Sequence, residues 1–262
     1  MIDFDRLTVT VADGIGTVTF DEPSNRNALD LGIADELVAA AAALGDDPEV
    51  RCIVLTHAGD FFGTGADLTQ FEGEASDAVL LRRLAGRIHE AVIQFHQGET
   101  PVVGGVDGIA AGVGFSLTLV PDLLLLSEEA RLEYAYPRIG LTGDGGATFF
   151  LPRLVGLRAA KEIVLLDEPI GAERARDLGL ATEVVAADAF DARLDDVAGQ
   201  IASGPTAALG PASALLTESF DRSLAAQLAA ETDAIAAAAH TTDFQRGFEA
   251  FFGDGDPDFV GY

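Results

Sequence analysis

Apolar and polar residues alternate along the first part of the chain, in the segment "LTVTVADGIGTVTF" (residues 7–20). A period of two is typical of β-strands, and the Asp13-Gly14 pair at the centre is a common turn. The segment therefore predicts a hairpin. The alanine-rich segment "NALDLGIADELVAAAAAL" (27–44) follows and predicts a helix that ends at Asp46-Asp47-Pro48.

The middle of the chain alternates short apolar runs with helical patterns. "RCIVLTH" (51–57) predicts a buried strand and leads into the glycine loop "GDFFGTGADL" (59–68). Residues 76–97 carry apolar side chains at helical spacing. "PVVGGVDGIAAG" (101–112) predicts one strand, which leads into a helix over "VGFSLTLV" (113–120).

The rest of the chain becomes increasingly helical. "DLLLLSEEARLEY" (122–134) predicts two short strands, and "TEVVAA" (182–187) predicts another. Strands that alternate with helices over about 190 residues are typical of an α/β fold with parallel strands. We therefore expect an α/β domain over residues 1–187 and a helical region over residues 188–262.

The charge of the chain is strongly negative. Asp and Glu number 43 against 16 Lys and Arg, so the formal net charge is -27. Such a surface repels itself in dilute buffer, but at about 1 M salt the Debye length falls to about 3 Å. The composition favours a cytoplasmic protein adapted to molar salt, and an ordinary acidic protein is the alternative. Nucleic acid and anionic membranes are not expected partners.

Several common signatures are missing from the sequence. No apolar run is long enough to cross a membrane, and the N-terminal segment does not read as a secretory leader. The chain has neither a phosphate-binding P-loop nor a GxSxG elbow. Its four histidines lack zinc spacing, so we predict no metal site. The single cysteine, Cys52, excludes an intrachain disulfide and is expected in the core.

Two glycine loops join a strand to a helix, "FFGTGADL" (61–68) and "GIAAGVGFSL" (108–117). A free backbone N–H at such a junction can point toward an anion, and two from different loops can hold one carbonyl oxygen. Glycine turns of this kind also occur for purely structural reasons. The loops alone leave both interpretations open.

A third glycine-rich segment, "PRIGLTGDGGAT" (137–148), carries one carboxylate, Asp144. Asp144 lies six residues after Arg138 and is surrounded by glycines that allow tight turns and close approach to a ligand. The aspartate is either a turn residue or a catalytic group directed into a pocket.

Six segments in a fixed order resemble the crotonase (enoyl-CoA hydratase/isomerase) superfamily along nearly the whole chain. They are "NRNALD", "FFGTGADL", "GVDGIAAGVGFSL", "PRIGLTGDGGATFFLPRLVG", "ARDLGLATEVV" and "DFQRGFEAFF". The resemblance implies an α/β spiral of ββα turns with a helical C-terminal trimerisation region. It also implies a homotrimer or a dimer of trimers. The implied substrate is an acyl-CoA thioester, with coenzyme A as part of the substrate and no separate cofactor.

The same resemblance assigns residues to the site. The donors to the thioester oxygen are the N–H groups of Ala66 and Val113. Removing one oxyanion-hole donor typically costs about 10²–10³ in rate, and no side chain is needed for this role. The resemblance places a further set at the substrate: Arg26, Asp67, Leu68, Gly112, Ser116, Arg138 and Leu141.

The chain departs from the hydratases of this superfamily at two positions. Those enzymes use two glutamates to hold and activate water, and the matching residues here are Ser116 and Arg138. The sequence thus argues against hydration by that route. Asp144 matches an aspartate of some isomerases and dehalogenases, and the pattern looks most like the phenylacetate-pathway isomerases. Those enzymes shift a double bond or convert a ring epoxide to an oxepin in CoA thioesters.

We therefore expect an acyl-CoA double-bond (or epoxide–oxepin) isomerase with Asp144 as its acid and base. Phe71, Phe115 and Leu141 are expected to form an apolar pocket. Arg26 is either a ligand of the CoA phosphates or a surface residue. Arg138 is expected to face a partner carboxylate or the pocket rim, and Ser116 to fill space.

Three alternatives stay open: an enoyl-CoA hydratase with an unusual arrangement, Asp144 as a nucleophile as in the dehalogenases, and a non-catalytic acyl-CoA-binding relative.

Overall fold

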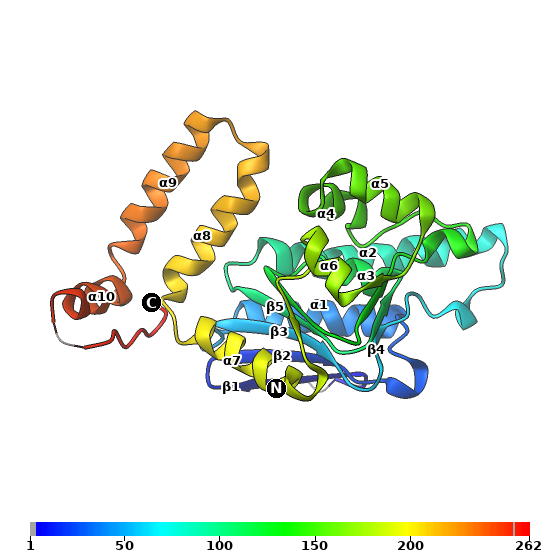
Figure 1. The fold of residues 1–262 in the computed structure, drawn as a ribbon, viewed down its shortest axis with the longest axis horizontal. Helices are drawn as coiled ribbons and strands as arrows, with labels where there is room; N and C mark the ends of the chain where they lie inside the picture. The colour runs from blue at the N-terminus through cyan, green and yellow to red at the C-terminus, as the bar shows by residue number, and fades with distance from the viewer. Residues whose placement is uncertain (1–3, 254) are drawn as a thin grey trace.

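The computed structural model describes residues 4–253 and 255–262, and two β-sheets lie at the centre of the described chain (Figure 1). The larger sheet has the order β1-β2-β3-β5-β7-β10 and the smaller sheet the order β4-β6-β8-β9. The strands of the larger sheet are β1 (Leu7–Ala12), β2 (Ile15–Phe20), β3 (Cys52–His57), β5 (Val102–Val106), β7 (Leu123–Ser127) and β10 (Glu183–Val185). Those of the smaller sheet are β4 (Phe61–Gly63), β6 (Ile109–Ala111), β8 (Arg131–Glu133) and β9 (Ile170–Gly171).

The predicted hairpin is confirmed. Strands β1 and β2 pair antiparallel from Leu7 opposite Phe20 to Ala12 opposite Ile15. The two-residue turn between them has positive φ at both Asp13 (51°) and Gly14 (77°). This is the turn geometry that matches the right-handed twist of paired strands. From β2 onward the neighbouring strands of the larger sheet run parallel.

The chain winds as repeated ββα turns. Each strand of the larger sheet from β3 to β7 is followed by a strand of the smaller sheet, which gives the pairs β3-β4, β5-β6 and β7-β8. The helices after these pairs are α2 (Ala78–Gln97), α3 (Val113–Leu117) and, after β8, α4 (Ala147–Leu154) with α5 (Gly156–Leu166). The structure thus has the α/β fold with the ββα turns that the resemblance implied.

The prediction of one strand over residues 101–112 is wrong, because the chain changes sheet within this segment. β5 ends at Val106 and β6 begins at Ile109. Between them Gly108 has φ of +157°, and a Cβ there would lie 2.2 Å from the carbonyl oxygen of Asp60. Only a residue without a side chain fits this crossing, so the glycine permits the turn between the sheets.

Helix α1 (Leu31–Gly45) starts later than the sequence pattern suggested. The side chain of Asp30 accepts a hydrogen bond of 3.0 Å from the Ile33 N–H and so caps the helix at its first turn. The apolar face of α1, including Ile33 and Leu37, is buried in the main core together with Leu84 and Ile88 of α2. This core fills the space between the larger sheet and the two helices.

A second core lies on the other side of the larger sheet. It is formed where α7 (Phe190–Ala202) packs Phe190 and Leu194 against Cys52, Val54 and neighbouring strand residues. Cys52 is fully buried, as expected, and this burial raises the pKa of its thiol to about 12. The short helix α6 (Ala172–Leu178) lies between β9 and β10 in the chain.

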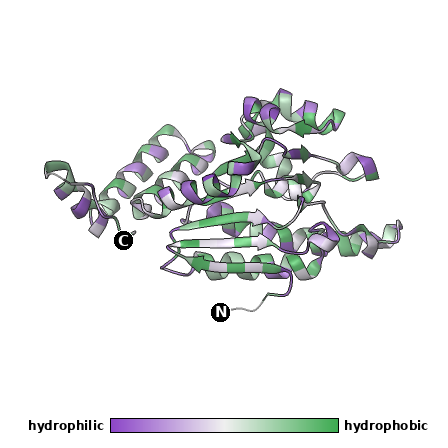
Figure 2. Ribbon diagram, turned by 60° about the horizontal axis from the view of Figure 1, so that its bottom comes forward, coloured by the Kyte–Doolittle hydropathy of each residue, from purple (hydrophilic) through white to green (hydrophobic). Residues whose placement is uncertain are grey.

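The last three helices extend away from the sheets (Figure 1). They are α8 (Thr206–Glu218), α9 (Leu224–Ala238) and α10 (Thr242–Phe252). Figure 2 shows that hydrophobic residues continue along this arm although it lies outside both cores. Large apolar side chains are exposed there, namely Leu216, Phe220, Leu224, Leu228, Ile235, Phe244, Phe248, Phe251 and Phe252.

Across residues 4–253 and 255–262, none of the helices combines the length and the apolar character that crossing a membrane requires.

Candidate active site

The two glycine loops and the third glycine-rich segment meet at one cavity of about 510 Å³. Its wall is built from the loop after β4, the start of α3, one face of α2 and residues 135–144. Seven of the residues that the resemblance assigns to the site lie on this wall: Ala66, Leu68, Gly112, Val113, Arg138, Leu141 and Asp144.

The Ala66 and Val113 loops touch through glycine. Gly112 has φ of +55°, and a Cβ there would lie 3.2 Å from the Cα of Gly65. Because neither glycine has a side chain, the two loops come close enough to place Ala66 and Val113 at the same part of the cavity. Val113 is the first residue of α3, so its N–H has no intrahelical partner. Within the described residues, neither of these two N–H groups donates to a loop or turn carbonyl.

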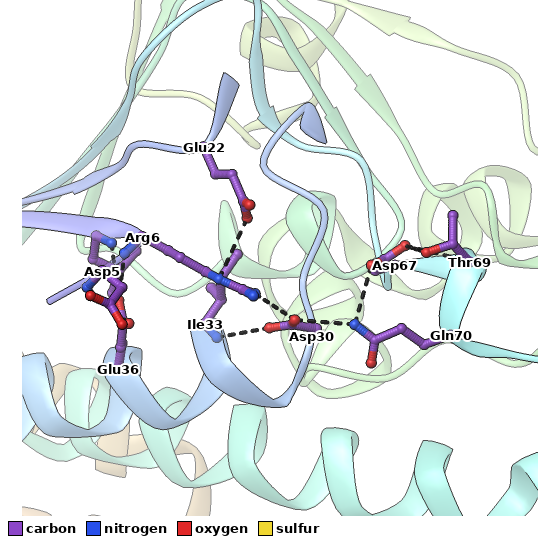
Figure 3. A network of polar contacts seen from close by, with 10 residues as sticks. Asp5, Arg6, Glu22, Asp30, Ile33, Glu36, Asp67, Thr69 and Gln70 are labelled. Carbon is purple, nitrogen blue, oxygen red and sulfur yellow. Dashed lines mark hydrogen bonds and ion pairs between the residues drawn. The ribbon is translucent and has the colours of Figure 1, made fainter. Parts of the chain in front are cut away.

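A polar network fixes the loop that follows Ala66 (Figure 3). Oδ1 of Asp67 accepts hydrogen bonds from the Thr69 N–H (3.1 Å) and the Thr69 hydroxyl (2.7 Å). The amide of Gln70 donates to Asp67 Oδ2 (3.2 Å) and to Asp30 Oδ2 (3.1 Å). Asp67, assigned by resemblance to the substrate, is therefore used in the turn after Ala66 and does not line the cavity.

The network connects this turn to the start of α1. Asp30 pairs with Arg6 from the segment before β1 and also caps α1 (Figure 3). Burial alone would raise the pKa of Asp30, but hydrogen bonds from Arg6, the Ile33 N–H and Gln70 outweigh it and lower this pKa. The Thr69 hydroxyl is the main cause that lowers the pKa of Asp67. Both carboxylates thus remain ionised acceptors that position the loop.

Asp144 is half-buried on the cavity wall, and its side chain has one short hydrogen bond. The hydroxyl of Tyr136 donates to Oδ1 of Asp144 at 2.6 Å. The main chain also turns here, since the Asp144 carbonyl accepts from the Ala147 N–H at 3.1 Å. The residue therefore occupies a turn and presents its carboxylate at the cavity.

Two further contacts hold the Asp144 segment from either side. The Gly143 N–H donates to the hydroxyl of Tyr134 at 2.9 Å. The Gly145 N–H donates to Nε2 of His89, on α2, at 3.1 Å. The two contacts restrict where the Asp144 side chain can lie.

Tyr136 is the residue of this site that sequence reasoning missed. It is buried, and this burial, reinforced by the Asp144 carboxylate, raises its pKa well above its usual range. The phenol therefore remains protonated and donates to Asp144. The signal in the sequence is "EYAYP", in which two tyrosines alternate directly before the proline of the third segment.

Ser116 lies behind Tyr136 and is fully buried. Its hydroxyl is 2.9 Å from the Tyr136 hydroxyl and donates weakly to the Gly112 carbonyl at 3.4 Å. Ser116 does not line the cavity. It thus contacts the tyrosine that contacts Asp144, which is more than the space-filling role expected from the sequence.

Arg138 meets both arrangements expected, because it faces partner carboxylates and also lines the cavity. Its guanidinium pairs with Glu133 and with Oδ2 of Asp167, the latter at 2.7 Å. Glu133 also pairs with Arg131 at 2.6 Å. The carboxylate of Glu133, whose side chain is buried, is therefore occupied on both oxygens.

Three other sequence expectations have different outcomes. Phe115 is fully buried in the main core and Phe71 packs against that core, so neither belongs to the cavity wall. Leu141 does line it. The side chain of Arg26 is exposed and lies over the ring of Phe61, 5.6 Å from its centroid, outside the cavity.

Within residues 4–253 and 255–262, no group of three or more His, Cys, Asp or Glu side chains is arranged to hold a metal ion.

Comparison with known proteins identifies a family. A family model described as enoyl-CoA hydratase/isomerase matches residues 10–261. A Rhodobacter capsulatus protein named "Probable enoyl-CoA hydratase" is 33% identical over 262 residues, which cover 99% of this chain and 100% of the relative. The crystal structure of an enoyl-CoA hydratase/isomerase from Cupriavidus metallidurans has a TM-score of 0.90 and 29% identity, covering 100% of this chain and 98% of that one.

Two relatives carry other names. The 4-chlorobenzoyl coenzyme A dehalogenase-2 of an Arthrobacter species is 33% identical and covers 76% of this chain and 73% of the relative. The 1,2-epoxyphenylacetyl-CoA isomerase of Escherichia coli is 28% identical and covers 96% of this chain and 97% of the relative. Similarity to these proteins does not separate hydration from isomerisation, so that distinction depends on the residues at the cavity.

Proposed function

Because the chain belongs to the enoyl-CoA hydratase/isomerase family, also called the crotonase superfamily, we propose that this enzyme isomerises a double bond in an acyl-CoA thioester. Asp144 is the single acid and base of this reaction. The N–H groups of Ala66 and Val113 hold the thioester oxygen. Coenzyme A enters as part of the substrate, and the proposal needs no separate cofactor.

The observation that carries the proposal is the composition of the cavity wall. Among the described residues, Asp144 is the only carboxylate that lines the cavity, and Ala66 and Val113 line it too. The rest of the wall is mainly apolar, with side chains such as Leu84 and Ile88. A lone base beside two free N–H donors suits proton transfer next to a carbonyl group.

The proposed reaction moves one proton in two steps. Asp144 removes a proton from C2 of a 3-enoyl-CoA, and the electron pair of the broken C–H bond spreads to the thioester oxygen. The N–H groups of Ala66 and Val113 stabilise the resulting dienolate; removing one such donor typically costs about 10²–10³ in rate. Asp144 then returns the proton to C4, which leaves the double bond between C2 and C3.

Tyr136 has a positioning role in this proposal. Its hydrogen bond of 2.6 Å engages Oδ1 of Asp144 and leaves Oδ2 for the substrate proton. Ser116 supports the tyrosine from behind at 2.9 Å. A carboxylate that transfers a proton from C2 to C4 must reach both carbons, so a fixed orientation over one face of the substrate helps both steps.

The two positions that match the hydratase glutamates support isomerisation over hydration. Ser116 is fully buried behind Tyr136, and the guanidinium of Arg138 is held by Glu133 and Asp167. Neither residue can serve as a second carboxylate that holds a water molecule. The ring-epoxide reaction remains a variant of the proposal, since it also needs a CoA thioester and an acid/base at the cavity.

The decisive experiment offers 3-enoyl-CoA and 2-enoyl-CoA of equal chain length to the enzyme in molar KCl. Isomerisation produces the absorbance of a conjugated enoyl thioester, and hydration removes it. We expect the first signal and not the second. Hydration of 2-enoyl-CoA as the main activity would overturn the proposal in favour of a hydratase.

The same assay separates the remaining alternatives. Conversion of 4-chlorobenzoyl-CoA to 4-hydroxybenzoyl-CoA, followed by its absorbance, would indicate that Asp144 acts as a nucleophile. Binding of acyl-CoA without turnover of any of these thioesters would indicate a binding protein.

A further inference from the structure

One face of α2 forms one side of the cavity, so positions along the helix mark the two ends of that side. Leu81, Arg82, Ala85 and Ile88 all line the wall. The next residue of the helix, His89, accepts a hydrogen bond of 3.1 Å from the Gly145 N–H and so lies directly beside the Asp144 segment. The end of this face near residue 89 therefore marks the catalytic end of the cavity.

Arg82 precedes His89 by seven residues, which is close to two helical turns. An α-helix rises 1.5 Å per residue, so Arg82 lies about 10 Å along the axis from His89 and on nearly the same face. Its main chain is thus distant from the Asp144 segment, but its side chain borders the same cavity. Arg82 marks the end of the α2 wall opposite to the catalytic end.

Arg82 is also the one charged side chain on the wall that has neither a hydrogen-bond nor an ion-pair partner among the described residues. The guanidinium of Arg138 pairs with two carboxylates, and Asp144 accepts from Tyr136. Arg82 forms no ion pair with any residue that the structure describes.

Most arginines of this acidic chain pair with a carboxylate. Nine of the fifteen form an ion pair within the described residues, for example Arg6 with Asp30, Arg87 with Asp35 and Arg193 with Glu183, and Arg82 is one of the six that do not. A cation that borders an apolar cavity without such a partner is available to a ligand.

On the basis of the proposed function, we propose that Arg82 binds a carboxylate at the far end of the acyl chain. The substrate class is then an enoyl thioester of a dicarboxylic acid. Arginine presents a planar pair of N–H donors that matches a carboxylate, and such pairs are stronger than neutral hydrogen bonds. A local cation would also offset the repulsion that a chain of net charge -27 exerts on an anionic substrate.

The test measures binding of saturated thioesters, which cannot be isomerised. Adipoyl-CoA is compared with hexanoyl-CoA, and suberoyl-CoA with octanoyl-CoA, by calorimetric titration at the lowest KCl concentration that keeps the protein folded. Each pair has the same number of carbons and differs in the terminal carboxylate. We divide the Kd of the monocarboxylic thioester by the Kd of the dicarboxylic one. This ratio is expected to be about threefold to fivefold larger in the parent than in Arg82→Met.

Three variants accompany this measurement. Arg82→Met keeps the apolar stem and removes the charge, and Arg82→Lys keeps the charge and is expected to retain part of the preference. Arg83→Met removes the neighbouring arginine, which is exposed like Arg82 but does not line the cavity, and is expected to keep the parental ratio. Arg82→Met and Arg83→Met have the same net charge, so the repulsion that the acidic surface exerts on the extra carboxylate cancels when their ratios are compared.

The outcomes separate this inference from the proposed function. If the protein binds neither member of a pair, the proposed function fails. If it binds both members of each pair with the same ratio in the parent and in Arg82→Met, the inference is overturned and the proposed function stands.

A last comparison excludes the phosphates of CoA as the anion. The titrations are repeated with pantetheine thioesters, which lack these phosphates. Arg82→Met should still reduce the preference for the dicarboxylic chain. If it weakens all CoA thioesters equally and has no effect on pantetheine thioesters, Arg82 binds a phosphate and the inference is wrong.

Discussion

The hydroxyl of Tyr136 donates a hydrogen bond of 2.6 Å to Oδ1 of Asp144, and burial keeps this phenol protonated. The two residues are eight positions apart, on either side of the Pro137 turn. Hydrogen bonds to a charged group are typically worth about 1.5–3 kcal/mol, so the contact is strong enough to fix the carboxylate. It makes Tyr136 the most informative position after Asp144.

Tyr136→Phe is expected to lower kcat by about tenfold or more, because the ring stays in place while Asp144 loses its orienting donor. KM and the Kd of a saturated acyl-CoA should change little. Tyr134→Phe is the matched control: its hydroxyl accepts from Gly143 and does not contact Asp144 in the described structure. Equal losses of kcat in the two variants would show that both act only through the stability of the segment.

Asp144→Asn keeps the shape of the side chain and removes the proton acceptor. Isomerisation should fall by about 10²-fold or more, while binding of acyl-CoA persists because the backbone donors remain. Ser116→Ala, which removes a group that contacts only Tyr136 and Gly112, should cost much less. Turnover and calorimetric titration measure both effects, and near-parental turnover in Asp144→Asn would rule out Asp144 as the base.

Because of His57, the free energy of unfolding is expected to decrease as the pH becomes mildly acidic. Burial lowers the pKa of His57, and the nearby Asp107 and Asp60 only partly oppose this; its Nε2 accepts a hydrogen bond of 3.0 Å from the Asp107 N–H. The pKa of His57 in the folded protein lies below the unfolded value of about 6.5. The stability that neutral His57 contributes is therefore complete above about pH 6.5 and is lost as the pH falls. One proton changes stability by at most about 1.4 kcal/mol per pH unit.

Denaturant unfolding between pH 7.5 and about pH 5 tests this. His57→Gln keeps an acceptor but does not titrate, so its stability should fall less steeply than that of the parent. His96, whose pKa burial also lowers, remains in both proteins and leaves some dependence. Identical slopes in the parent and in His57→Gln would contradict the assignment.

The net charge of -27 predicts a strong dependence of stability on salt. Repulsion among exposed carboxylates is screened when the Debye length shortens from about 10 Å to about 3 Å between 0.1 M and 1 M salt. The melting temperature should therefore rise by about 10 °C or more over this range of KCl, a few kcal/mol for a chain of this size. A flat dependence would remove the case for adaptation to high salt.

The helical arm formed by α8, α9 and α10 predicts self-association. Leu224, Ile235, Phe251 and Phe252 are each more than seven-tenths exposed on it, which is unfavourable unless a partner covers them. We expect three or six copies of the chain by sedimentation in molar KCl, and dissociation in Phe251→Glu. A monomer in the parent protein under these conditions would contradict the prediction.

Local patterns in the sequence were sufficient for the alternation of strands and helices and for three of the segments that line the cavity. They did not predict the face of α2 on its wall or the two strands within residues 101–112. Period-two alternation gave the β1–β2 hairpin because a strand presents alternate residues to one face, whatever its neighbours are. The glycine loops indicated a backbone donor site, since residues without side chains permit close approach. Asp144 could be identified as the candidate base by resemblance, because the hydratase carboxylates are replaced by Ser116 and Arg138.

Other features depend on contacts between distant residues, and no local pattern encodes them. The change of sheet between β5 and β6 requires glycine at position 108, because the carbonyl oxygen of Asp60 leaves no room for a Cβ. Whether Arg138 reaches a substrate or a carboxylate depended on Asp167, which is 29 residues away and folds back beside it.

By itself the sequence determined the α/β order of strands and helices, the strongly acidic surface and the residue types available for chemistry. Only the tertiary structure decided which of them meet: Tyr136 and Ser116 behind Asp144, Asp67 in a turn, and Arg82 on the cavity wall. The physical reason is the separation along the chain over which each effect acts. Periodicity and turn preferences act over a few residues, whereas a hydrogen bond or an ion pair forms wherever the packed core brings two groups within about 3 Å.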